Sequence, residues 1–116
     1  MDFNEYQDKC SQTAVYPNRL NNYIYPTLGL NGEAGEVAEK IKKIIRDKDG
    51  IINNQDREEI KKEIGDVLWY ASALCDELKL SMEDVAISNI RKLTNRIKRD
   101  KLKGEGDNRW IGINII

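Results

Sequence analysis

Histidine is missing from this 116-residue chain, and cysteine occurs only at Cys10 and Cys75. Without histidine, no imidazole is available as a general base, as the activator of a nucleophile or as a metal ligand. Two cysteines outside a Cys-x-x-Cys arrangement do not make a disulfide framework, so we expect two ordinary thiols in a reducing compartment. Any chemistry must therefore rely on carboxylates, lysines, tyrosines or a bound metal ion.

Long apolar runs and net charge are also lacking. No segment approaches the roughly 18 apolar residues of a membrane span, and the acidic residues 1–5 do not resemble the start of a signal peptide. The 19 lysines and arginines nearly balance the 20 acidic residues, for a net charge of −1. A nucleic-acid binder needs a strongly basic face. We therefore expect a cytoplasmic protein with neither a membrane nor a nucleic-acid partner.

Apolar residues recur at the helical period through most of the chain. This pattern predicts helices over about residues 2–14, 26–47, 56–79 and 82–101, and the run at 47–50, Asp-Lys-Asp-Gly, is expected to end the second of them. Ser81 is the expected N-cap of the last helix, and residues 110–116 alternate weakly, as a short extended segment would. Strands and helices do not alternate, which argues against a parallel sheet. The prediction is an all-α fold, as one domain over 1–116 with a core at about 25–103 and a polar tail at 104–116.

Two pairs of acidic residues stand out on the second and third predicted helices. Glu33 and Glu36 are three residues apart, as are Glu63 and Asp66, so the members of each pair share one helical face. Two antiparallel helices with these faces toward each other would gather four carboxylates at one point. Burying like charges unpaired is costly, and a hard divalent cation removes that cost. Magnesium takes oxygen ligands and accepts substrate phosphates.

The same spacing is also common on solvated helix faces, so spacing alone leaves both interpretations open. Glu39 and Glu59 are expected to be solvated, with an outer-ligand or base role as the alternative. Glycines adjoin the acidic pairs at Gly32, Gly35 and Gly65. Each costs about 1 kcal/mol in a helix interior. That cost suggests that a neighbouring helix or a ligand approaches the backbone there.

A cationic face is predicted on the last helix, where Asn89, Lys92 and Arg96 are spaced i, i+3 and i+7. Lysine and arginine so placed can hold phosphate oxygens. The alternative is a solvated basic face, because the stretch 91–103 carries further lysines and arginines. Tyr70 lies one helical turn beyond the second acidic pair, where it would stack on a nucleotide base or belong to the core.

In their order and spacing these features resemble the MazG-like family of all-α nucleoside triphosphate pyrophosphohydrolases. The family's signature is Glu-x-x-Glu, a spacer and Glu-x-x-Asp. Here it is Glu33-Ala34-Gly35-Glu36 and Glu63-Ile64-Gly65-Asp66, with 26 residues between. Three further matches are Gly29-Leu30-Asn31-Gly32, the pattern Asn89-x-x-Lys92-x-x-x-Arg96 and the Gly-Asp-Asn-Arg tail at 106–109. The resemblance covers about residues 25–109.

The resemblance implies a four-helix-bundle-like fold that oligomerisation completes, as a homodimer or homotetramer. It also implies hydrolysis of (deoxy)nucleoside triphosphates between the α and β phosphates, giving a nucleoside monophosphate and pyrophosphate. The implied Mg²⁺ ligands, with Mn²⁺ as a substitute ion, are Glu33, Glu36, Glu63 and Asp66. Of these, Glu36 and Glu63 are the expected catalytic residues, with Glu39 as an alternative base. The implied substrate contacts are Asn89, Lys92 and Arg96 on the phosphates and Tyr70 near the base or sugar.

Other functions stay open at this point. A noncatalytic helical module would bind nucleotide, or a partner, without cleaving anything. A nucleic-acid binder would use the basic stretch 91–103, against which the near-zero net charge argues. Residues 1–24 match nothing that selects a base, so the preferred base and sugar are not predicted.

Overall fold

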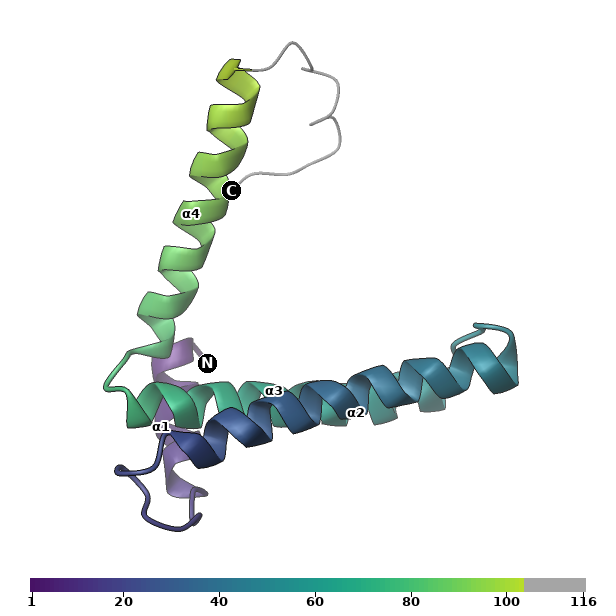
Figure 1. The fold of residues 1–116 in the computed structure, drawn as a ribbon, viewed down its shortest axis with the longest axis horizontal. Helices are drawn as coiled ribbons and strands as arrows, with labels where there is room; N and C mark the ends of the chain where they lie inside the picture. The colour runs from purple at the N-terminus through teal and green to yellow at the C-terminus, as the bar shows by residue number, and fades with distance from the viewer. Residues whose placement is uncertain (104–116) are drawn as a thin grey trace. The chain divides into compact units, whose positions relative to one another are not determined.

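The computed structural model describes residues 1–103, which form four α-helices and no strand (Figure 1). The helices are α1 (Phe3–Gln12), α2 (Ile24–Lys48), α3 (Asn54–Glu77) and α4 (Met82–Lys103). The predicted all-α class is confirmed. The predicted polar tail, its Gly-Asp-Asn-Arg run and the extended segment at 110–116 lie outside the described residues.

The chain divides into two compact units, residues 1–82 and the part from Glu83 onward. The first unit contains α1, α2 and α3, and the second contains nearly all of α4. Glu83 and Asp84 lie in the first turn of α4, where negative charge is favourable for the helix dipole. Among the described helices, none combines the length and the apolar character needed to cross a membrane. The single-domain organisation stays a prediction.

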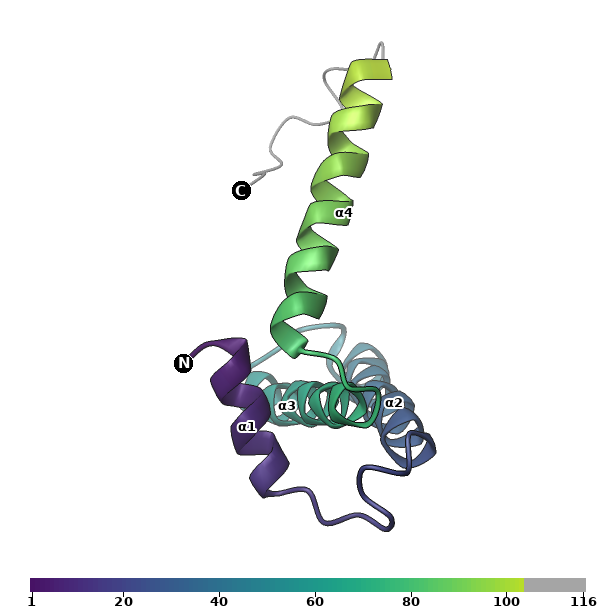
Figure 2. The same cartoon turned by 90° about the vertical axis from the view of Figure 1, so that its left-hand side faces the viewer.

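Helices α2 and α3 lie side by side as an antiparallel hairpin (Figures 1 and 2). Helix α2 ends where the run 47–50 predicts. Asp49 adopts a left-handed conformation (φ 53°), and so does Gly50 (φ 75°), whose N–H donates to the Ile44 carbonyl over 3.1 Å. Glycine adopts that conformation without steric cost, so the chain can turn sharply here.

A capping box starts α3 two residues earlier than predicted. The Asn53 side chain accepts from the Asp56 N–H over 2.8 Å, and the Asp56 carboxylate accepts from the Asn53 N–H over 3.1 Å. Such reciprocal bonds satisfy two backbone donors at the helix start. Asp56 is buried and also accepts from Lys48 over 2.7 Å, which ties the end of α2 to the start of α3.

Helix α1 packs against α3 (Figure 2). The indole N–H of Trp69 donates to the Thr13 hydroxyl over 2.8 Å, and the Gln7 amide donates to Asp76 over 2.8 Å. The buried apolar side chains around this packing are Cys10, Ala73, Cys75 and Met82. Both thiols are free, as the sequence predicts.

Several apolar residues of the hairpin are not part of this core. Leu28 is 67% exposed, Ile45 63%, Ile64 54% and Leu68 37%. Helical periodicity alone would place all four in a core, and that expectation is wrong within one chain. The physical reason is that a two-helix hairpin buries only one stripe of each helix, while these residues lie beyond that stripe.

Candidate functional site

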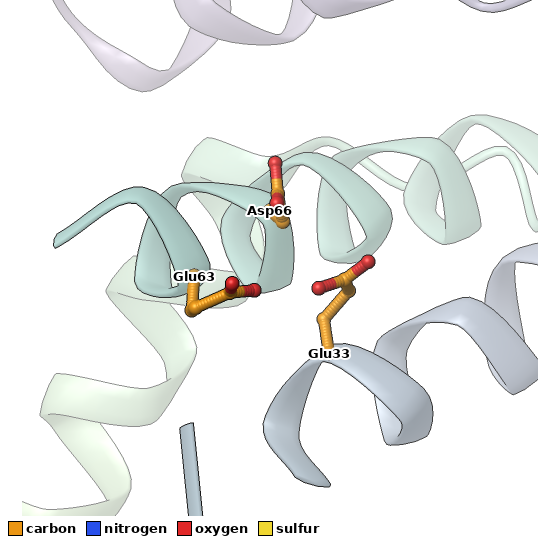
Figure 3. A group of neighbouring side chains, drawn as sticks. All are labelled: Glu33, Glu63 and Asp66. Atoms are coloured by element: carbon orange, nitrogen blue, oxygen red, sulfur yellow. The ribbon is translucent and has the colours of Figure 1, made fainter. Parts of the chain in front are cut away.

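Three of the four predicted metal ligands converge in the α2–α3 hairpin. Glu33 comes from α2, and Glu63 and Asp66 come from successive turns of α3. One carboxylate oxygen from each lies within 4.8 Å of the others, and Figure 3 shows the carboxylates of Glu33 and Glu63 facing each other, with Asp66 beside them on α3. The two glutamates are half-buried and the aspartate is exposed. We call these three residues the acidic cluster.

Electrostatic repulsion in the acidic cluster is visible at Glu33. Burial and a hydrogen bond with Glu63 raise the pKa of the Glu33 carboxyl above its usual range, and the charges of Asp66 and Glu63 raise it further. A raised carboxyl pKa means that the charged form is disfavoured where it stands. The cluster therefore favours a proton or a cation among its oxygens.

Glu36 lies outside the acidic cluster and is exposed. Residues three apart on a helix differ by roughly 60° around its axis, so Glu33 and Glu36 do not point in the same direction. Its charge still contributes to the raised pKa of Glu33, so it lies close enough to act on the cluster electrostatically.

Glu39 and Glu59 are engaged elsewhere on the hairpin. Glu39 pairs with Lys42 at 2.8 Å, and Glu59 lies 3.9 Å from the Lys40 amine. Neither belongs to the acidic cluster. Their placement fits the expectation of solvated side chains, and the lysine partners are seen only in the structure.

Tyr70 lies beside the acidic cluster, on the face that its spacing predicts. A Cβ atom added at Gly29 would come within 2.2 Å of Cε1 of the Tyr70 ring, so the ring rests directly on the backbone of α2. Burial raises the pKa of the Tyr70 hydroxyl, and Tyr25, Glu33 and Asp66 add to the shift. Of the four glycines near the acidic pairs, Gly29 is therefore the one whose Cβ position has a described atom close by.

The prediction of close backbone approach does not hold for the other three glycines within this chain. A Cβ added at Gly32, Gly35 or Gly65 would meet no described atom within 4 Å. These positions line the helices next to the acidic cluster but face open space. A ligand as the cause of the glycines stays a prediction.

Tyr6 is a neighbour of the cluster that sequence reasoning did not single out. Burial and a hydrogen bond with Cys10 raise the pKa of its hydroxyl, and the charge of Asp66 adds to the shift. The only signal in the sequence was that Tyr6 shares an apolar face with Cys10 on the first helix. Tyr6 of α1 thus lies close enough to Asp66 for that charge to act on its hydroxyl.

The predicted phosphate-binding residues Asn89, Lys92 and Arg96 are all exposed on α4. They belong to the second compact unit, whereas the acidic cluster belongs to the first. Their spacing keeps them on one face of the helix, and their role with substrate stays a prediction.

Comparison with known proteins identifies a relationship that matches this geometry. The family model of the MazG nucleotide pyrophosphohydrolase domain matches residues 26–99. This span includes the acidic cluster, Glu36, Tyr70 and the three predicted phosphate-binding residues of α4. The chain is also 43% identical over 109 residues to the Gene 37 protein of Mycobacterium phage L5, covering 90% of this chain and 96% of that protein. No solved structure matches the chain. The chain belongs to the MazG nucleotide pyrophosphohydrolase family, whose activity is that of a pyrophosphohydrolase-type enzyme.

Proposed function

We propose that the protein hydrolyses (deoxy)nucleoside triphosphates between the α and β phosphates, releasing a nucleoside monophosphate and pyrophosphate. The observation that carries the proposal is the convergence of Glu33, Glu63 and Asp66 from two helices within 4.8 Å of one another. Three carboxylates so close are unfavourable unless a cation or protons offset their charge. The membership in a family of nucleotide pyrophosphohydrolases supports the same reaction.

The donor set fits Mg²⁺, with Mn²⁺ as a substitute. Every donor in the acidic cluster is a carboxylate oxygen, and the chain has no histidine that would favour a softer metal. Oxygen-only sites suit hard cations, and Mg²⁺ is typically held by a few carboxylates together with water and substrate phosphates. In the proposal, Glu36 would be the fourth ligand.

The ion, when bound, screens the triphosphate and makes a coordinated water more acidic. The chain's own residues divide the remaining work. Glu63 or Glu36 orients the attacking water and accepts its proton, with Glu39 a less favoured base because of its lysine partner. Lys92 and Arg96 offset the negative charge that develops on the leaving pyrophosphate.

The nucleoside end of the substrate lies, in this proposal, against Tyr70. Its ring rests on the α2 backbone at Gly29, and the charges of Glu33 and Asp66 act on its hydroxyl. Aromatic faces stack on nucleobases with little discrimination between them. Asn89 assists the phosphate contacts from α4.

A second copy of the chain is the proposed protein partner, in a homodimer or homotetramer. The apolar residues left exposed on the hairpin support this, since Leu28 and Ile64 are each more than half exposed. An open apolar pocket of about 410 Å³ is lined by Ile41, Ile52, Arg57, Ile60, Lys61 and Ile64. Large contiguous apolar surfaces typically mark association sites. A cytoplasmic location and the lack of a nucleic-acid partner remain predictions.

Variants of the acidic residues test the proposal most sharply. Purified protein is incubated with each nucleoside triphosphate and Mg²⁺, and the products are separated. Glu63→Gln and Glu36→Gln are expected to lose turnover while keeping the helical circular dichroism signal. The matched surface variant Glu58→Gln is expected to keep both turnover and that signal. Full activity in Glu36→Gln would remove that residue from the site. Stabilisation by nucleotide without turnover in the wild-type protein would favour a noncatalytic nucleotide-binding module instead.

A further inference from the structure

One carboxylate at the C-terminal end of α3, that of Glu77, holds the segment that joins α1 to α2. Its Oε2 accepts hydrogen bonds from the Tyr16 hydroxyl and from the Leu20 N–H, the latter over 2.7 Å. Its Oε1 accepts from the Asn22 N–H over 2.6 Å. Burial opposes its ionisation, but these three bonds hold the pKa of Glu77 below its usual range. The carboxylate is therefore charged at neutral pH.

The joining segment needs such an anchor because of its backbone. Asn18 (φ 53°) and Leu20 (φ 71°) both adopt left-handed conformations, which are unfavourable for a residue such as leucine. The Leu20 side chain is 55% exposed, so its own packing contributes little to holding the turn. The bonds to Glu77 therefore help to fix the path of the segment, together with the ion pair between Arg19 and Asp76 at 3.3 Å.

Tyr16 connects this anchor to the tyrosines beside the acidic cluster. Its ring is 8% exposed and stacks on that of Tyr25, with centroids 5.1 Å apart and planes 6° from parallel. Tyr25 lies in the first turn of α2, is hydrogen-bonded to Tyr70, and is still 43% exposed. The charge of Glu33 in the cluster acts on the Tyr70 hydroxyl. A chain of interactions thus runs from Glu77 to the proposed metal site, entirely within residues 1–82.

We propose that Glu77 is a positioning residue for the nucleoside end of the substrate: it holds Tyr16 in place, and through the Tyr16–Tyr25 stack it sets where Tyr25 and Tyr70 meet the base and sugar. This inference rests on the proposed function, because it assumes that phosphates occupy the acidic cluster. Glu77 itself touches no substrate. Its effect is on nucleoside recognition and leaves the pyrophosphate end of the site unaltered.

The test separates the two ends of the substrate. Binding of the five common nucleoside monophosphates and of inorganic pyrophosphate, each with Mg²⁺, is measured by calorimetry for the wild type and for Glu77→Gln. The amide nitrogen of glutamine cannot accept a backbone N–H, so one bond of the anchor is lost. We expect the best-bound monophosphate to bind about tenfold more weakly, as for a lost charge-assisted hydrogen bond, and pyrophosphate binding to be unchanged. Glu58→Gln, whose side chain is 69% exposed, is the matched control.

Unchanged monophosphate binding, or equal loss of both ligands, in Glu77→Gln would overturn this inference alone. If that variant does not fold, Tyr16→Phe decides, because it removes only the hydroxyl and keeps the stacked ring. A folded Tyr16→Phe should bind the monophosphate about threefold more weakly, a smaller loss than in Glu77→Gln because the stacked ring and both backbone bonds to Glu77 are kept, and wild-type affinity would overturn the inference. A wild-type protein that binds neither ligand would overturn the proposed function as well.

Discussion

Replacement of Glu33 by glutamine should have opposite effects on stability with and without magnesium. At the 4.8 Å separation within the acidic cluster, a pair of like charges repels by about 1–3.5 kcal/mol for effective dielectric constants between 80 and 20. Removing the Glu33 charge from metal-free protein relieves two such pairs. The free energy of unfolding at pH 8 in EDTA should therefore rise by about 1 kcal/mol or more, which raises Tm by several degrees.

Magnesium should reverse this order. A bound ion stabilises the folded state by RT ln(1 + [Mg²⁺]/Kd), and the variant, with one ligand fewer, gains less. Thermal denaturation followed by circular dichroism over a Mg²⁺ titration should show the two Tm curves crossing. Glu58→Gln, a surface change on the same hairpin, should follow the wild type throughout. A Glu33→Gln protein that is less stable than wild type in EDTA would refute the electrostatic argument.

Three further predictions concern stability without metal or nucleotide. First, the raised pKa of Glu33 means that the folded state binds its proton more tightly than the unfolded state does. The contribution of Glu33 to stability is thus largest below the pKa of the unfolded state, about 4.3, and is lost as pH rises through the folded-state pKa. In denaturation at a series of pH values, the free energy of unfolding of Glu33→Gln should lack this part of the pH dependence. Second, Gly29→Ala should lower the free energy of unfolding, measured in urea, by up to about 2 kcal/mol, because the clash with Tyr70 outweighs the gain in helix propensity. Gly32→Ala, where the added methyl group meets open space, should raise it by up to about 1 kcal/mol. A stabilised Gly29→Ala would contradict the contact. Third, Asn53→Ala should cost about 1 kcal/mol through loss of the capping box, and no loss would show that the cap does not stabilise α3.

The parts of the fold that are local in sequence could be predicted. The helical period located all four helices, and the run at 47–50 located the turn between α2 and α3, because both depend on near neighbours in the chain. Periodicity says which face of a helix is apolar but not what covers it. For this reason the pattern alone could not predict that Leu28 and Ile64, which have the spacing of core residues, are exposed in a single chain.

The acidic cluster was predictable for the same local reason, since the structure brings together three of the four predicted metal ligands. The Glu77 anchor was not. A single glutamate at a helix end has no periodic signature, and its partners Tyr16, Leu20 and Asn22 are more than 50 residues away in sequence. The left-handed backbone of Leu20 adds to the difficulty, since leucine rarely adopts it.

The central claim is that the carboxylates of one helical hairpin support metal-dependent cleavage between the α and β phosphates. The most direct measurement is product analysis with a nucleoside triphosphate, with Mg²⁺ and with EDTA. Nucleoside monophosphate and pyrophosphate should form in equal amounts, and only when the ion is present. Release of orthophosphate and a nucleoside diphosphate, or equal turnover in EDTA, would contradict it.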